Sequence, residues 1–166
     1  MTQPGRNRVA GNHLEELVAE WYQLRGYFVR QNVQVGKRSR GGWECELDIV
    51  AIHPIEKRVV HVEPSLDASS WQEREQRYHK KFEAGRKYIP EIFSGVDLPA
   101  TIEQIALFVF GGGERSTLAG GRVLFIKDFM KVILDGIRTR RVDSAAIPEQ
   151  YPLLRSLSVC SPVLAY

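Results

Sequence analysis

Apolar residues recur every three or four positions near the start of the chain, at Leu14, Leu17, Val18 and Trp21. This spacing predicts a helix over residues 12–25 that buries one face. Asn12 is a favoured N-cap residue, and Glu15 three positions later completes a pattern like a capping box. Gly26 is the residue type that commonly follows the end of a helix.

Three segments rich in aromatic and β-branched residues follow, at residues 27–35, 43–52 and 57–64. Each segment predicts a strand, because these residue types pack well on a pleated surface. A basic, glycine-containing turn at 36–42 and a proline-containing turn at 53–56 separate them. Since the segments are closely spaced, we expect the strands to pair as antiparallel hairpins.

The second half of the chain alternates between polar and apolar segments. They predict a long polar helix over 68–88, strands over 105–110 and 123–126, and helices over 128–137 and 152–159. The segment at 105–110 is apolar throughout, which is typical of a strand covered on both faces. Pro90 is expected to break the long helix near its end.

The order of these elements predicts one α/β domain with a mixed sheet flanked by helices. A chain of 166 residues, 43% hydrophobic and 26% charged, suits a single globular domain. We expect this domain at residues 11–137, after a flexible N-terminus at 1–10. Residues 138–166 are expected to form an extension that packs on the domain or makes a dimer contact.

Composition argues against a membrane protein and a secreted one. The longest apolar run, Ile105–Phe110, is far below the roughly 20 residues that span a bilayer. Residues 1–8 lack the apolar run of a signal peptide, and Cys45 and Cys160 form no disulfide framework. These features favour a cytoplasmic protein with no membrane partner.

The net charge of +3 permits nucleic-acid binding without requiring it. Basic residues gather in three places, Lys37–Arg40, Arg74–Lys87 and Arg138–Arg141. Such clusters are most often solvated faces, so charge alone identifies no partner.

Two carboxylates are expected to meet on one face of the sheet. Side chains two residues apart in a strand share a face, which groups Glu46 with Asp48, and His61 with Glu63 and Ser65. A hairpin around the turn at 53–56 then makes Asp48 and Glu63 near neighbours. Close carboxylates repel unless a cation lies between them, and Mg²⁺ favours such oxygen ligands. A bound Mg²⁺ can activate water and stabilise charge on a phosphate.

A third acid lies on the first predicted helix. Glu15 is at the border of the apolar face, whereas Glu16 points into solvent, so Glu15 is the better placed to look toward the sheet. Helix capping and a favourable interaction with the helix dipole also account for Glu15, and on spacing alone they are the more common roles.

Together these residues resemble the PD-(D/E)XK nuclease superfamily, with its restriction-endonuclease-like fold. The matching parts are the helix bearing Glu15, the Gly26-Tyr27 turn, and the segments Glu46–Ala51 and Val59–Ser65. The resemblance covers residues 11–93 and is nearest in character to the Holliday-junction-resolvase and Mrr-like branches. It implies an α-β-β-β-α-β core and an enzyme that hydrolyses phosphodiester bonds in nucleic acid, with DNA the expected substrate.

The resemblance also implies roles for the acids. Glu15 would be the helix acid, and Asp48 and Glu63 would be the ligands of Mg²⁺, or of Mn²⁺ in its place. The superfamily's motif lysine, however, falls on Ser65. A lysine on the following helix, Lys80 or Lys81, is the candidate to replace it, and Gln76 is a weaker, neutral candidate.

The basic clusters gain a role from the same resemblance. Lys37, Arg38 and Arg40 would contact a phosphate backbone from the first turn, and Arg74 and Arg77 would do so from the long helix. Trp71 and Tyr78 could stack on bases, although packing under that helix is the more common role of such residues. A homodimer is the arrangement implied for members that cut both strands.

Other functions stay open at this stage. If no basic side chain reaches Asp48 and Glu63, the same fold would bind nucleic acid or a partner protein with little or no catalysis. A small-molecule enzyme with an acidic metal site is a third alternative, which the basic surface disfavours.

Overall fold

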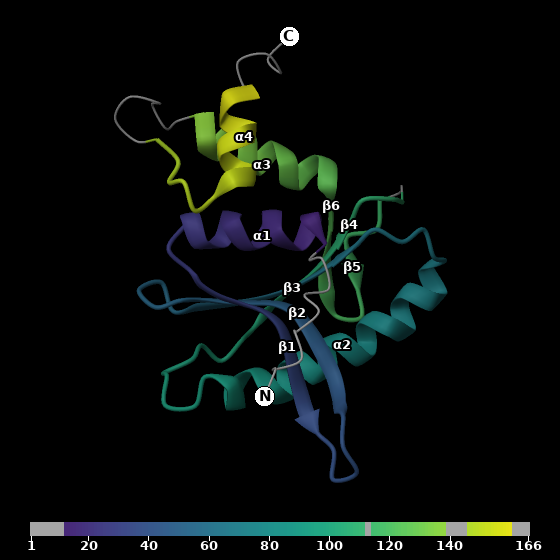
Figure 1. The fold of residues 1–166 in the computed structure, drawn as a ribbon. Coiled ribbons are helices and arrows are strands. Elements are labelled where there is room, and N and C mark those ends of the chain that lie inside the picture. Colours follow the sequence, from purple (N-terminus) through teal and green to yellow (C-terminus); the bar gives the residue numbers. More distant parts are fainter. Residues whose placement is uncertain (1–11, 112–113, 139–145, 161–166) are drawn as a thin grey trace, which may run out of the picture.

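The computed structural model describes residues 12–111, 114–138 and 146–160, which form one mixed α/β domain. Its elements are α1 (His13–Leu24), β1 (Phe28–Lys37), β2 (Trp43–His53), β3 (Arg58–Ser65), α2 (Trp71–Ile92), β4 (Glu103–Phe108), β5 (Thr117–Leu118), β6 (Gly121–Phe125), α3 (Ile126–Arg138) and α4 (Pro152–Cys160). The strands form one sheet in the order β1-β2-β3-β4-β6-β5. Helix α2 covers one face of this sheet, while α1, α3 and α4 lie over the other (Figure 1).

Helix α1 begins and ends where its sequence predicts. The side chain of Asn12 accepts a hydrogen bond from the Leu14 N–H at 3.1 Å, which satisfies one of the free amides of the first turn. Gly26 follows the helix with a φ of +89°, a conformation that glycine adopts without steric cost. Val18 and Trp21 are buried, and with Ile49 and Ile105 of the sheet they belong to one apolar core.

The register of the hairpins sets the position of the candidate acids. β1 and β3 both pair antiparallel with β2, and Ile49 of β2 lies opposite Val62 of β3. One step further along, Asp48 lies beside Glu63. β4 then pairs parallel with β3, and β6 parallel with β4, which confirms the mixed sheet.

Helix α2 begins at a complete capping box. Ser70 accepts from the backbone N–H of Glu73, and the Glu73 side chain accepts from the backbone N–H of Ser70. On its inner face, Phe82 and Ile89 are fully buried against the sheet. Pro90 does not break the helix as expected. Helix α2 continues two residues beyond it, to Ile92, because the buried Ile89 anchors its last turn.

The structure confirms the α-β-β-β-α-β order and adds details that the sequence pattern did not indicate. The short strand β5 was not predicted, and β4 runs over 103–108 rather than 105–110. Part of the predicted C-terminal extension, α4, packs with α1 and α3 in the same apolar core. Residues 1–11, which include the predicted flexible N-terminus, and most of the Arg138–Arg141 cluster lie outside the described residues.

Glu20 of α1 holds α4 in place. Its carboxylate is buried and accepts from the backbone N–H groups of Leu153 and Leu154, at 3.2 and 3.0 Å. These are free amides at the start of α4, so a side chain of α1 caps a helix far away in sequence. In the part of the chain that the structure describes, no helix is both long and apolar enough to cross a membrane.

Candidate functional site

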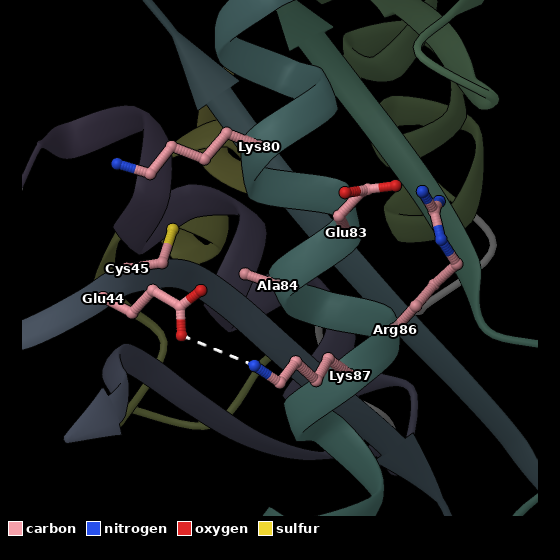
Figure 2. A pocket seen from close by; sticks show the side chains of 7 residues that line it. All are labelled: Glu44, Cys45, Lys80, Glu83, Ala84, Arg86 and Lys87. Carbon is pink, nitrogen blue, oxygen red and sulfur yellow. Dashed lines mark ion pairs between the residues drawn. The ribbon is translucent and has the colours of Figure 1, made fainter. Parts of the chain in front are cut away.

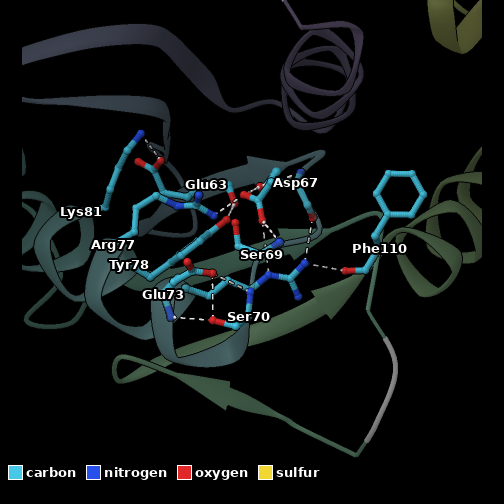
Figure 3. Close-up of polar contacts among 11 residues, drawn as sticks. Glu63, Asp67, Ser69, Ser70, Glu73, Arg77, Tyr78, Lys81 and Phe110 are labelled. Carbon is cyan, nitrogen blue, oxygen red and sulfur yellow. Dashed lines mark hydrogen bonds and ion pairs between the residues drawn. The ribbon is translucent and has the colours of Figure 1, made fainter.

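Three charged side chains converge where β2 and β3 meet α2. The ammonium nitrogen Nζ of Lys81 lies 2.6 Å from Oδ1 of Asp48 and 2.5 Å from Oε2 of Glu63. Figure 3 shows Lys81 of α2 reaching the Glu63 carboxylate. The backbone N–H of Asp48 donates to the second Glu63 oxygen, Oε1, at 3.2 Å. The predicted pairing of Asp48 with Glu63 is therefore confirmed, and Lys81 bridges the pair.

The site holds more negative charge than Lys81 neutralises. Burial, and after it the nearby Glu63, raise the pKa of Asp48 to about 7. Burial also raises the pKa of Glu63 above its ordinary value. Burial alone would lower the pKa of Lys81, but Glu63 and Asp48 together raise it above its ordinary value. Lys81 is therefore protonated at neutral pH. Because two carboxylates face this one ammonium group, additional positive charge would be stabilised at the site.

Glu15 belongs to the same electrostatic neighbourhood without joining the cluster. Burial, followed by the charge of Asp48, raises the pKa of the Glu15 carboxyl, while Lys81 lowers it. Among the residues placed in the structure, no three side chains of the His, Cys, Asp and Glu types stand close enough to share a metal ion. The expected acids thus resolve into a contacting pair, Asp48 and Glu63, with Glu15 nearby.

A buried hydrogen-bond chain orients Glu63. His61 is fully buried, and burial followed by the charge of Lys81 lowers its pKa to about 3, so its ring is neutral. The amide Nε2 of Gln104 donates to the backbone oxygen of Phe82 at 2.8 Å and meets His61 Nδ1 at 3.1 Å. Because Nδ1 must then accept, His61 Nε2–H is the donor to Glu63 Oε1, at 2.7 Å.

This chain continues outward to Arg86 and depends on a glycine. Arg86 Nη1 donates to the Gln104 side-chain oxygen at 2.5 Å. At Gly85, a Cβ atom would lie only 2.4 Å from His61 Nδ1, so α2 approaches the sheet this closely only because residue 85 has no side chain. The sequence pattern did not indicate the roles of Gln104 and Arg86. The position of Gln104 directly before the apolar run at 105–110 was the available signal.

The structure decides between the two candidate lysines. Figure 2 shows Lys80 extending from α2 toward Cys45, and both residues line a cavity. Lys81, the next residue, contacts both carboxylates. Gln76 is exposed on α2.

Ser65, at the position of the superfamily's lysine, belongs to a different network. Its hydroxyl donates to Asp67. The Asp67 carboxylate also forms an ion pair with Arg77 (Figure 3). Burial alone would raise the pKa of Asp67, but the hydrogen bonds from Ser65, Ser69 and Arg77 hold it below its ordinary range. Ser65 therefore helps to order the loop before α2.

Arg74 does not take the role expected for it, because only 2% of its surface is exposed. Its Nη2 donates to the backbone oxygens of Asp67 and Phe110, at 2.8 and 2.9 Å, and its guanidinium lies over Phe108. This side chain connects the loop before α2 with the residues that follow β4, and burial keeps it from a phosphate backbone. Tyr78 is also buried, as its packing role predicts.

The other basic residues that we expected to contact nucleic acid are exposed at the surface. Lys37, Arg38 and Arg40 are exposed around the turn between β1 and β2. Arg77 keeps 43% of its side chain exposed while it pairs with Asp67.

Comparisons of the chain with protein-family models, with curated proteins and with solved structures gave no match.

Proposed function

We propose that the protein is a Mg²⁺-dependent nuclease of the PD-(D/E)XK type that hydrolyses phosphodiester bonds in nucleic acid, most favourably DNA. The observation that carries this proposal is the cluster of Asp48, Glu63 and Lys81. It combines two carboxylates that can bind a metal with one cation that can face a phosphate. Lys81 takes over the function of the lysine missing at Ser65.

The donor set fits a magnesium ion. The oxygens Asp48 Oδ1 and Glu63 Oε2 already converge on a cation, the Lys81 ammonium. Glu63 Oε1 is occupied by His61 and the Asp48 N–H, which fixes the carboxylate and directs Oε2 toward the shared position. Mg²⁺ in proteins commonly takes one or two carboxylates and completes its shell with waters and substrate oxygens. Asp48 and Glu63 would hold the ion, and Mn²⁺ has similar preferences.

Each side chain has a distinct part in the proposed reaction. When bound, Mg²⁺ would supply an activated water and charge stabilisation at the phosphate. Lys81 stays protonated because its pKa is raised, so it stabilises negative charge on the phosphate instead of accepting a proton. Glu15, whose raised pKa makes it a better proton acceptor than a fully exposed glutamate, would take a proton from the attacking water.

Cleavage assays test the proposal directly. Single-stranded, double-stranded and branched DNA, and RNA, would be incubated with the full chain in Mg²⁺, in Mn²⁺ and in EDTA. We expect metal-dependent cutting that Asp48→Asn abolishes and that Glu46→Gln, an exposed change on the same strand, retains. Nucleic-acid binding without cutting in any metal would refute the nuclease and favour the non-catalytic module.

The same proposal extends to location and assembly. A nuclease acting on DNA in this way would work in the cytoplasm. Efficient cutting of both strands of a duplex would call for a homodimer, which sedimentation of the chain alone and with duplex DNA would detect.

A further inference from the structure

Two cavities lie along α2, each lined by residues of this helix and of the β1–β2 hairpin. The first, of about 550 Å³, lies between Glu44 and Cys45 of β2 and Lys80 and Lys87 of α2 (Figure 2). The second, of about 460 Å³, has walls that include Lys37, Trp43 and Tyr88. We call the two together the α2 trough.

Glu44 lines the first cavity and Tyr88 the second, and a hydrogen bond links these two walls. The Tyr88 hydroxyl donates to the Glu44 carboxylate, and Lys87 Nζ lies 3.6 Å from the same carboxylate. A Cβ atom at Gly36 would come within 2.6 Å of Glu44 and 2.7 Å of the Tyr88 hydroxyl. Only glycine therefore allows the hairpin to lie this close to α2, and that approach shapes the trough.

One end of the trough approaches the carboxylate cluster, although the three side chains of the cluster do not line it. Cys45 stands three residues before Asp48 on β2, and Lys80 directly precedes Lys81 on α2. The charges of Lys81 and Glu63 both act on the Cys45 thiol, which burial and Glu63 leave with a raised pKa. From Trp43 to Asp48 the strand extends about 17 Å, so the trough leads from the site over the length of a few nucleotides.

The lining chemistry fits the two parts of a nucleotide. Trp43 leaves 43% of its surface exposed on this wall, and the Tyr88 ring lies 4.5 Å from Lys87 Nζ. Aromatic faces of this kind stack on bases, and the nearby ammonium groups of Lys37, Lys80 and Lys87 suit phosphates. Glu44, Glu83 and Glu91 also line the two cavities, so a phosphate is expected beside the lysines and away from these acids. Glu44 repels phosphate less than a free carboxylate, because Lys87 and Tyr88 contact it.

The trough favours an unpaired strand over a duplex. Each cavity has the volume of a small-ligand site, which is too small to enclose a double helix. A base can place its flat face on Trp43 only when it is unstacked from its neighbours, as in single strands, loops and bulges.

We propose that the α2 trough binds a single-stranded segment of nucleic acid, with bases stacked on Trp43 and the backbone leading to the Asp48–Glu63–Lys81 cluster. This inference rests on the proposed nuclease function for its direction, and it names the substrate class as nucleic acid with an unpaired strand.

Binding without cleavage tests the trough. A short fluorescein-labelled oligodeoxythymidine would be titrated with the full chain in EDTA, with anisotropy and tryptophan fluorescence both recorded. We expect binding and quenching of tryptophan emission, and weaker binding to a fully paired duplex of the same length. Trp43→Ala should weaken single-strand binding by about tenfold and remove most of the quenching, while Trp43→Phe should recover much of the affinity.

The matched control is Phe28→Ala, since Phe28 is 68% exposed at the other end of the hairpin and lies away from the trough. It should bind as the unchanged protein does. Equal affinity for paired and unpaired DNA, or unchanged binding in Trp43→Ala, would overturn the proposal that the trough binds an unpaired strand, even if the protein cuts DNA. Binding with these signatures but no cutting in Mg²⁺ or Mn²⁺ would support the trough and refute the proposed nuclease.

Discussion

Replacing Asp48 by asparagine should make the folded protein more stable at pH 8, although the change removes a charged contact to Lys81. Asp48 is only 17% exposed, and burial with the nearby Glu63 raises its pKa from 3.8 to about 7. The folded protein therefore holds the neutral carboxyl more favourably than the ionised one. Asparagine has nearly the same shape as that neutral carboxyl and never ionises.

The sign follows from the direction of the shift. A folded-state pKa above the unfolded value contributes stability that is complete below about pH 4 and lost as the pH rises to about 7. The shift from 3.8 to about 7 corresponds to about 4 kcal/mol as an upper value, at 1.36 kcal/mol per unit. At pH 8 we expect Asp48→Asn to unfold at a temperature on the order of 5–10 °C higher than the unchanged protein.

Thermal and urea unfolding at pH 4 and pH 8 would measure the effect, with Glu46→Gln as the control on the same strand. The advantage of Asp48→Asn should be large at pH 8 and close to zero at pH 4. Excess Mg²⁺ at pH 8 should stabilise the unchanged protein, by about 2.7 kcal/mol at 100 times its Kd, and should leave Asp48→Asn unaffected.

Two results would refute this reasoning. If Asp48→Asn were no more stable than the unchanged protein at pH 8, the carboxylate pair would carry no electrostatic strain. If the same advantage appeared at both pH values, its cause would be packing and not ionisation. A lack of stabilisation by Mg²⁺ would argue separately against the metal site.

Three further changes test other parts of the structure. Lys81→Met should lower kcat for DNA cleavage by about 100-fold or more, whereas Lys80→Met should act mainly on KM, which steady-state kinetics would separate. Gly85→Ala, normally stabilising in a helix by about 1 kcal/mol, should instead destabilise by about 2 kcal/mol in urea unfolding because the new methyl displaces His61; a gain in stability would contradict the close packing. Glu20→Gln should cost about 1–2 kcal/mol, because the two carboxylate oxygens accept from different N–H groups of α4 and glutamine replaces one of these oxygens by an NH2 donor; an unchanged unfolding midpoint would show that this cap contributes nothing.

The paired carboxylates show how far a local pattern reaches. Alternation along two strands and a short connecting turn were enough to predict that Asp48 meets Glu63, and the register confirms it. The reason is physical: in a hairpin, the period of two and the turn length together fix which side chains are neighbours.

The helix next to that hairpin shows where local patterns stop. Arg74 looks like a solvated basic residue in the sequence, but the structure buries it among backbone oxygens of two other segments. His61 could be placed on the Glu63 face from spacing, whereas its hydrogen bond from Gln104 depends on how β4 joins the sheet. The capping of α4 by Glu20 likewise joins residues more than a hundred positions apart.

The sequence by itself therefore determined the order of the main helices and strands, without the short β5, and the acidic pair, since both follow from periodicity and short turns. Only the tertiary structure decided which lysine contacts that pair. Lys80 and Lys81 are adjacent on a helix, and consecutive side chains point about 100° apart, so the docking of α2 on the sheet selects between them. That docking depends on the buried Phe82 and Ile89 and on the absence of a side chain at Gly85, which are properties of the packed interface.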